Sequence, residues 1–263
     1  YSSLEDLRKN LDRSYKSSKL SPFPCRIREG KYRWKGKDFE FRNKFMDGSA
    51  IHGLLFNKDF AVVKEFSNHS MASITLNYQY RNDDPAYPHD YDCEIIYSLY
   101  PSQTLQVQTR LINKGQEDLP IADGWHPYFR LGGTADEWVM HFETEAMIEF
   151  DKHLVPTGRL IPFEPFNPPA KIGATEMDNC FKLKIPKDIP ACELFNPINK
   201  LKISFYPGIG YPYLQVYIPP HRKTVAIENL SAPPDCFNNK MGLTVLKPGA
   251  SENLELVYKL SIV

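Results

Sequence analysis

Alternation of apolar and polar residues with a period of two is the feature that most restricts the fold of this chain. In "SITLNYQY", Ile74, Leu76, Tyr78 and Tyr80 fall on one side of an extended chain. The same alternation recurs in "TLQVQTRLINKG", "LKISFYPG", "YLQVYIPP" and "SENLELVYKLSIV". Because side chains of a strand point alternately to its two faces, these runs predict half-buried β-strands.

Only the start of the chain has helical spacing, in Leu4, Leu7, Leu11 and Tyr15. Ser2 with Glu5 predicts a capping box at its N-terminus. Further along, "KYRWKGKDFEF" predicts two short strands around a Lys35-Gly36-Lys37 turn.

Prolines and glycines punctuate the strand runs, and the proline-rich stretch "RLIPFEPFNPPAKIG" predicts a long loop of the kind that often carries a site. No repeat of fixed period and no low-complexity linker divides the chain. We therefore expect an all-β protein with more than a third of its residues in strands. Residues 1–263 are expected to form one large antiparallel β-sandwich domain.

Composition excludes several classes of partner. Lysine plus arginine and aspartate plus glutamate number 32 each, so no net charge attracts nucleic acid or an anionic membrane. We expect a small neutral partner instead. The five cysteines are scattered without a C-x-x-C pair, which favours reduced, buried thiols and a cytoplasmic location. No apolar run is long enough to span a membrane.

Common catalytic motifs are absent, including the phosphate-binding, dinucleotide-binding, nucleophile-elbow and zinc-protease patterns. The seven histidines never fall at short metal-ligand spacings, so we expect no metal and no cofactor.

Five polar residues stand in unusual surroundings: Arg26 in "PFPCRIREG", His52 in "SAIHGLL", His126 in "DGWHPYF", Asp178 in "EMDNCF" and Glu228 in "VAIENLSAPPDCFN". Taken singly, each has an ordinary structural interpretation as a packed histidine, a surface cation or a turn residue. Glu228 and His126 are harder to explain in that way. A carboxylate at the end of a β-run is costly to bury, and an aromatic frame around His126 shields it from water.

Beside His52, Gly53 is expected to let the backbone come close to a ligand. Around His126, we expect Trp125, Tyr128 or Phe129 to help form the wall of the site.

These blocks, with "VPTGR", occur in the order found in the aldose 1-epimerase (galactose mutarotase-like) family, which the chain resembles from about Pro22 to its C-terminus. The resemblance implies a β-sandwich with a sugar bound in a cleft across one concave sheet. It also implies that Glu228 is the catalytic base and His126 the catalytic acid. Arg26, His52 and Asp178 match substrate-binding positions around the sugar hydroxyls.

The implied reaction explains why a carboxylate and an imidazole are needed. Interconversion of the α- and β-anomers of a free hexose removes the proton of the C1 hydroxyl and protonates the ring oxygen. The ring opens, C1 turns about the C1–C2 bond, and the ring closes on the other face. At neutral pH, an ordinary glutamate is ionised and an ordinary histidine can hold or release a proton.

Two features differ from the family pattern. Family members usually carry further strands before the arginine motif, whereas only about twenty residues precede it here. Either these strands are missing or the predicted helix takes their place. An unpaired sheet edge would favour association, so a monomer and a homodimer both stay open. The second difference is Cys25, which stands where asparagine is common.

Two alternatives remain. A hexose-6-phosphate 1-epimerase would need cations near the cleft, for which Arg28, Lys31, Arg130 and Arg222 are candidates. A non-catalytic carbohydrate-binding protein of the same fold is disfavoured because both the acid and the base are present.

Overall fold

The computed structural model describes residues 1–263 and begins with helix α1 (Leu4–Ser14). Its cap is Ser3, whose hydroxyl accepts a hydrogen bond from the backbone N–H of Asp6 at 3.0 Å. The expected capping box of Ser2 and Glu5 is therefore wrong by one position. α1 has no fully buried residue and lies on the surface of the molecule.

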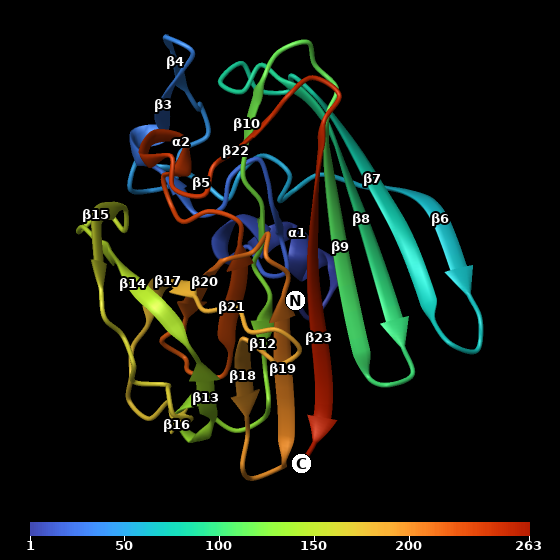
Figure 1. Cartoon of the computed structure of the whole chain (residues 1–263), viewed down its shortest axis with the longest axis vertical. Coiled ribbons are helices and arrows are strands. Elements are labelled where there is room, and N and C mark those ends of the chain that lie inside the picture. Colours follow the sequence, from blue (N-terminus) through green and yellow to red (C-terminus); the bar gives the residue numbers. More distant parts are fainter.

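Antiparallel strands, which make up 47% of the residues, confirm the predicted all-β fold. Two large sheets dominate it (Figure 1). The first is eight-stranded, with β12 (Tyr128–Phe129) paired to β21 beside the main path. That path runs β1 (Lys19–Leu20), β11 (Gly124–Trp125), β21 (Val225–Leu230), β20 (Tyr213–Tyr217), β17 (Asp178–Leu183), β14 (Thr144–Phe150), β15 (Pro156–Ile161).

The second large sheet is nine-stranded and contains most of the long alternating runs. Its order is β16 (Ala170–Lys171), β13 (Val139–Phe142), β18 (Cys192–Phe195), β19 (Leu201–Pro207), β23 (Ser251–Ile262), β9 (Thr104–Asn113), β8 (Asp90–Tyr100), β7 (Ala72–Arg81), β6 (Ala61–Ser67). The predicted strands over these runs are confirmed.

Three two-stranded sheets lie outside the large ones: β2 (Arg26–Ile27) with β5 (Ala50–Ile51), β3 (Lys31–Trp34) with β4 (Lys37–Glu40), and β10 (Leu119–Ile121) with β22 (Thr244–Leu246). The β3–β4 hairpin confirms the predicted turn, in which Lys35 and Gly36 both have positive φ. Helix α2 (Cys236–Asn239) and the 3₁₀ turns Arg28–Gly30 and Ala135–Glu137 complete the elements.

The main core lies between the two large sheets. Leu214 and Ile227 of the eight-stranded sheet pack in one cluster with Met140 and Phe205 of the nine-stranded sheet. Because neighbouring residues of a strand face opposite ways, Ile227 in this core directs Glu228 to the other face of the sheet. The strand pattern thus presents polar side chains on the face away from this core.

A second core cluster joins the small sheets to β7 and β8. It includes Phe23 and Phe41 on one side and Tyr80 and Tyr91 on the other. Beyond it, β6 is a free edge of the nine-stranded sheet, and all its residues are exposed. Lys64 lies in the middle of β6, and charged side chains there discourage edge-to-edge pairing.

The proline-rich stretch is shorter as a loop than expected, because its first residues belong to β15 and its end belongs to β16. Phe163 and Phe166 pack against Phe142, with ring centroids 6.0 and 5.7 Å apart. The loop therefore covers the main core, and none of the expected site residues lies on it.

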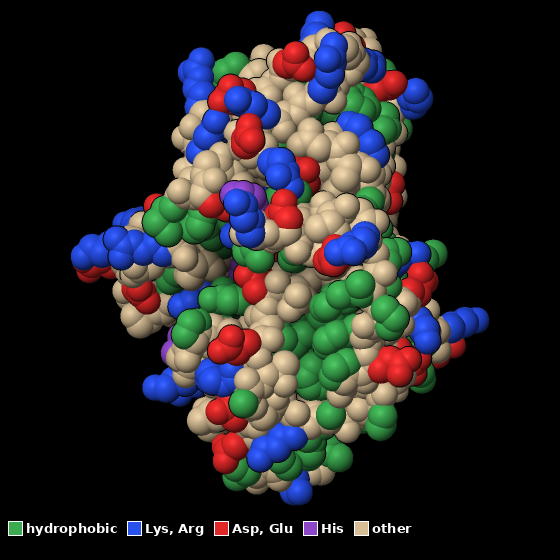
Figure 2. Space-filling view, turned by 90° about the vertical axis from the view of Figure 1, so that its left-hand side faces the viewer, with side chains coloured by type: hydrophobic (Ala, Val, Ile, Leu, Met, Phe, Trp, Pro, Cys, Tyr) green, Lys and Arg blue, Asp and Glu red, His purple; other side chains and the backbone are tan.

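All five cysteines are buried free thiols. None of the helices has the length and hydrophobicity that crossing a membrane requires. Figure 2 shows basic and acidic side chains intermixed over one face of the molecule, with no large area of one charge.

Candidate active site

The eight-stranded sheet provides the floor of the candidate site. In its register, Gln215 of β20 lies between Cys180 of β17 and Glu228 of β21. Asp178 is two residues before Cys180 and therefore shares their face. Glu228 is only 2% exposed, and Asp178 is half-buried. Regular strand pairing thus brings together two carboxylates that are fifty residues apart in the sequence.

His126 lies between β11 and β12 and contacts Glu228 directly. Its Nε2 is 3.3 Å from Oε1 of Glu228. The backbone on either side is held by the N-terminal segment: Ser17 N–H donates to the His126 carbonyl at 2.8 Å, and His126 N–H donates to the Ser18 carbonyl at 3.2 Å. The imidazole is stacked on the ring of Tyr128, with centroids 5.0 Å apart and an interplanar angle of 11°.

Of the three expected wall residues, only Tyr128 is in contact with the imidazole. The ring of Trp125 lies under the ammonium of Lys19 and against Tyr97. Phe129 packs on Phe205 in the interior. Alternation along the "GWHPYF" segment explains this difference, because adjacent residues of an extended chain point to opposite sides.

His52 and Arg26 come from the small β2–β5 sheet, in which Arg26 is opposite Ile51. His52 has a positive φ of 60°, and its N–H donates to the carbonyl of Cys25 at 2.7 Å. Its ring centroid is 5.0 Å from that of His126. Cys25 also has a positive φ, and strained backbone of this kind is concentrated at functional sites.

Gly53 does not have the expected role, which was to let a ligand come close to the backbone. It has a φ of +74°, and a Cβ there would lie 2.3 Å from the carbonyl oxygen of Ser21. Glycine is needed at this position because two backbone segments cross closely.

Arg26 has a carboxylate partner that the sequence did not suggest. Its Nε donates to Oδ2 of Asp47 at 3.0 Å, and both side chains are partly exposed. The guanidinium lowers the pKa of Asp178 and of Glu228, so it faces both carboxyl groups from across the site. Arg26 therefore lies at the rim of the site, with the acid–base pair beneath.

Burial dominates the electrostatics of the acid–base pair. Desolvation raises the pKa of Glu228 well above its ordinary value; Asp178 adds to this shift and Arg26 opposes it. Desolvation lowers the pKa of His126 to about 4. Burial thus works against both the ionised glutamate expected from ordinary values and the protonated form of the histidine. Each member of the pair is held toward its neutral form.

His52 is also kept neutral. Burial lowers its pKa well below the ordinary value, and His126 and Arg26 lower it further. Asp178 has a pKa raised by burial, partly offset by Arg26 and by a hydrogen bond from Gln215. The site therefore combines buried, mostly neutral polar groups, which suit an uncharged hydroxylated molecule better than an ion.

Gln215 is a site residue that the sequence analysis missed. Its Nε2 donates to Oδ1 of Asp178 at 2.6 Å, while its own Oε1 has no hydrogen-bond partner. A signal was present in "YLQVY", where a single amide interrupts a strand that is otherwise apolar. A buried amide in a central strand needs partners, and the site supplies one of them.

Four buried polar atoms at the site have no hydrogen-bond partner within the protein: Nδ1 of His52, Nδ1 of His126, Oε1 of Gln215 and Oε2 of Glu228. Such atoms are rare in folded proteins and are costly without a partner. These four atoms are the polar groups of the site that remain available to a bound molecule or to water. Glu228 and His126 are both buried, and the cleft expected around the five residues stays a prediction.

No group of three histidine, cysteine or carboxylate side chains is placed to hold a metal ion. The nearest thiols, Cys25 and Cys180, are buried, and burial raises the pKa of each. Neither is therefore activated as a nucleophile.

Comparison with known proteins places the chain among sugar-epimerase relatives. The family model described as aldose 1-epimerase matches residues 3–259. An uncharacterized protein of Escherichia coli (strain K12), YihR, is 29% identical over 242 residues, which cover 89% of this chain and 76% of that protein.

Solved structures share the fold. A galactose mutarotase-like protein from Clostridium acetobutylicum has a TM-score of 0.88 at 20% identity, covering 98% of this chain and 82% of that chain. Galactose 1-epimerase from Lactobacillus acidophilus NCFM has a TM-score of 0.83 at 17% identity, covering 99% and 83%. At these identities the structural likeness establishes the fold alone.

Proposed function

Because this chain belongs to the aldose 1-epimerase family, we propose that it interconverts the α- and β-anomers of a free, uncharged hexose. The observation that carries the proposal is the contact between His126 and Glu228 at 3.3 Å, with a further buried polar atom free on each side chain. An acid and a base in one place are what anomer interconversion requires.

The closeness of the two groups fits the atoms on which they act. The C1 hydroxyl oxygen and the ring oxygen are bonded to the same carbon, so the groups that serve them must also be neighbours. The reacting form of the pair has Glu228 ionised and its single proton on His126, although burial by itself favours the neutral form of each group. From that form, Glu228 takes the proton of the C1 hydroxyl while His126 gives its proton to the ring oxygen. The bond from C1 to the ring oxygen breaks, leaving an open-chain aldehyde.

Ring closure reverses the proton transfers. After C1 has turned about the C1–C2 bond, the ring hydroxyl attacks the opposite face of the carbonyl and returns its proton to His126. Glu228 returns its proton to the carbonyl oxygen, which becomes the C1 hydroxyl of the other anomer. Asp178, Arg26 and His52 hold the remaining hydroxyls, and Gln215 orients Asp178. No step calls for a cofactor.

A sugar phosphate is a poorer candidate than a free hexose. The guanidinium of Arg28 is paired with Asp151, and that of Arg222 is paired with Asp136. Lys31 lies 4.0 Å from Glu29 and is mostly exposed. Of the four candidate cations, only Arg130 lies without a carboxylate partner, and cations already paired with carboxylates make a weak phosphate site.

Polarimetry tests the proposal. The purified protein should speed the equilibration of freshly dissolved α-glucose or α-galactose, and should act less efficiently on glucose 6-phosphate. Binding of a free hexose without faster equilibration would instead support a carbohydrate-binding protein. A preference for the phosphorylated sugar would support the sugar-phosphate alternative.

The pH profile of kcat/KM tests the roles of the pair. We expect kcat/KM to fall below about pH 4. His126 is then protonated while Glu228 is still protonated, so the pair holds two protons and lacks a base. We also expect kcat/KM to fall above the raised pKa of Glu228, where the last proton leaves. The residual activity of Glu228→Gln should lack this alkaline limb, and an unchanged profile would contradict the assignment.

A further inference from the structure

Four aromatic rings from separate parts of the chain form a row through the candidate site. Tyr15 lies 4.5 Å from His52, His52 lies 5.0 Å from His126, and His126 lies 5.0 Å from Tyr128, measured between ring centroids. His126 and Tyr128 belong to the segment leading into β12, and His52 follows β5. Tyr15, at the end of the row, follows helix α1.

Tyr15 is the point at which α1 is attached to the site. It caps the helix with a positive φ of 47°, and its N–H donates to the carbonyl of Leu11 at 2.8 Å. Its ring packs on Phe56 as well as on His52. Tyr15 is only 8% exposed, whereas Leu4 at the other end of α1 is 71% exposed.

Ring packing alone holds the imidazole of His52. Its backbone N–H bonds to Cys25, but its Nδ1 is buried without a hydrogen-bond partner. Its aromatic neighbours are Tyr15, with an interplanar angle of 55°, and His126, with an angle of 73°. Histidines that bind a ligand are usually oriented by a second hydrogen bond, and here the aromatic contacts stand in its place.

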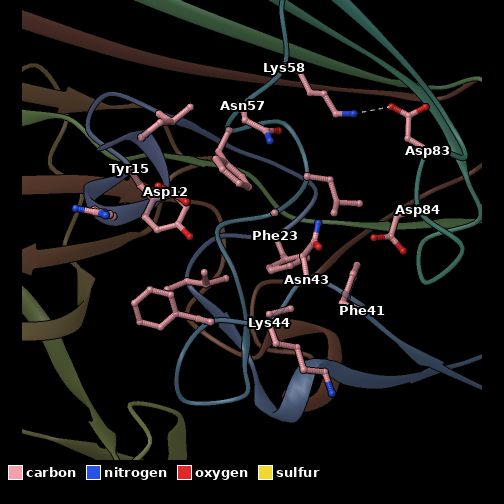
Figure 3. A pocket seen from close by; sticks show the side chains of 18 of the residues that line it. Asp12, Tyr15, Phe23, Phe41, Asn43, Lys44, Asn57, Lys58, Asp83 and Asp84 are labelled. Carbon is pink, nitrogen blue, oxygen red and sulfur yellow. Dashed lines mark hydrogen bonds and ion pairs between the residues drawn. The ribbon is translucent and has the colours of Figure 1, made fainter. Parts of the chain in front are cut away.

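Tyr15 also lines an open cavity of about 770 Å³. Figure 3 shows Tyr15 and Asp12 on one side of it and the ion pair of Lys58 with Asp83 on the other. Ile51 and Gly53, which flank His52, also line the cavity. Tyr15 thus contacts both His52 and this cavity, so removal of its ring would open space beside the imidazole.

We propose that Tyr15 is a positioning residue, whose ring clamps the imidazole of His52 against His126 and so fixes the hydrogen-bonding geometry offered to the sugar. The proposal rests on the proposed function. In this proposal the role of α1, none of whose residues is buried, is to position the Tyr15 ring at the site.

The test compares Tyr15→Ala with Tyr15→Phe. Removal of the ring frees His52 to turn toward the cavity, so Tyr15→Ala should raise KM about three- to tenfold and change kcat less, as expected for loss of one aromatic contact. Tyr15→Phe keeps the ring and should behave like the wild type. Leu4→Ala, an exposed change in the same helix, is the matched control and should have no effect.

A second readout does not depend on catalysis. The imidazole of His52 can be followed by NMR through a pH titration, in which burial holds its pKa well below the ordinary value. In Tyr15→Ala its resonances should move and its pKa should rise, because water reaches the ring. If the wild type shows no epimerase activity, the pKa of His52 still tests the proposal, because loss of the Tyr15 ring current moves the resonances but does not raise the pKa. An unchanged His52 pKa in Tyr15→Ala would then overturn the proposal.

A folded Tyr15→Ala protein with the wild-type KM and unchanged His52 resonances would overturn the proposal. If that variant does not fold, Tyr15→Leu keeps the apolar volume without the aromatic face. It should still shift the His52 resonances, and unchanged resonances would overturn the proposal equally.

Discussion

The segment from Asp123 to His126 takes part in two buried pairs of ionisable side chains. Asp123 is paired with Lys19, whose ammonium also lies 3.3 Å from the carbonyl of Gly124 and 4.3 Å from the centre of the Trp125 ring. Tyr211 donates to the same oxygen of Asp123 at 2.7 Å. Burial raises the pKa of Asp123, but Lys19 and Tyr211 both oppose this shift.

The pair of His126 and Glu228, three residues further on, has no comparable support. His126 and Glu228 make no side-chain hydrogen bond to any other protein group, whereas Oδ1 of Asp123 accepts from both Lys19 and Tyr211. The first pair is therefore suited to stay charged and to hold the segment in place. The second is suited to exchange a proton with a bound molecule, because neither charged form is stabilised in advance.

Glu228→Gln is the change expected to have the largest effect. The amide keeps the size of the side chain but cannot accept the C1 proton, so kcat should fall by about 10²- to 10⁴-fold with little change in KM. Polarimetry at saturating sugar measures this. Glu193→Gln, which alters a partly buried carboxyl on β18 of the nine-stranded sheet, is the matched control. If Glu228→Gln retained most of the activity, Glu228 could not be the catalytic base.

Lys19→Met should act on stability instead. It leaves Asp123 buried without its cation, which typically costs about 3–5 kcal/mol in the free energy of unfolding. Denaturant unfolding measures this cost. The double variant Lys19→Met/Asp123→Asn should recover part of it, and Lys9→Met, which breaks an exposed pair with Glu5, should cost less than about 1 kcal/mol. Equal costs for Lys19→Met and Lys9→Met would show that the buried pair does not anchor the segment.

Asp178→Ala should have a smaller effect than Glu228→Gln, and it should act mainly on KM instead of kcat. Asp178 binds a hydroxyl and accepts from Gln215 without taking part in proton transfer. KM should rise by about tenfold, in line with the loss of one hydrogen bond to a charged group, while kcat changes less. A loss confined to kcat would instead place Asp178 in the chemical step.

The smallest expected effect is on the pH dependence of stability. The pKa of Glu228 is raised in the folded protein. The contribution of Glu228 to the free energy of unfolding is therefore fully present below its pKa in the unfolded chain, and it is lost as pH rises through its pKa in the folded protein. Glu228→Gln should therefore lose less stability than the wild type between acidic and neutral pH. Parallel pH–stability curves for the two proteins would contradict the raised pKa.

Much of the fold and of the site could be predicted because the signals are local. Alternation in "YLQVYIPP" or "SENLELVYKLSIV" follows from a strand with one face buried, so the strands were predictable. The ordered motifs likewise pointed to Arg26, His52, His126, Asp178 and Glu228. The structure brings His52, His126 and Glu228 into a row of contacts, with Asp178 on the same sheet face as Glu228 and Arg26 at the rim.

Other features of the site could not be read from such signals. The single amide in "YLQVY" marked Gln215 as unusual but not its partner Asp178, and Tyr15 looked like an ordinary helix residue, because the partners of both are distant in the sequence. Gly53 looked like a ligand-facing glycine, although the close neighbour is the backbone of Ser21. Each of these parts is set by which segments meet, and that depends on long-range pairing.

The sequence by itself determined the strand content of this protein, the balance of its charges and the residue types available for acid–base chemistry. These are properties of a residue and its near neighbours. Only the tertiary structure decided that Glu228 and His126 are buried in contact and that burial moves their pKa values in opposite directions. The cost of a charge depends on the water and the partners around it, and those are settled only when β21, the segment before β12 and the N-terminal residues pack together.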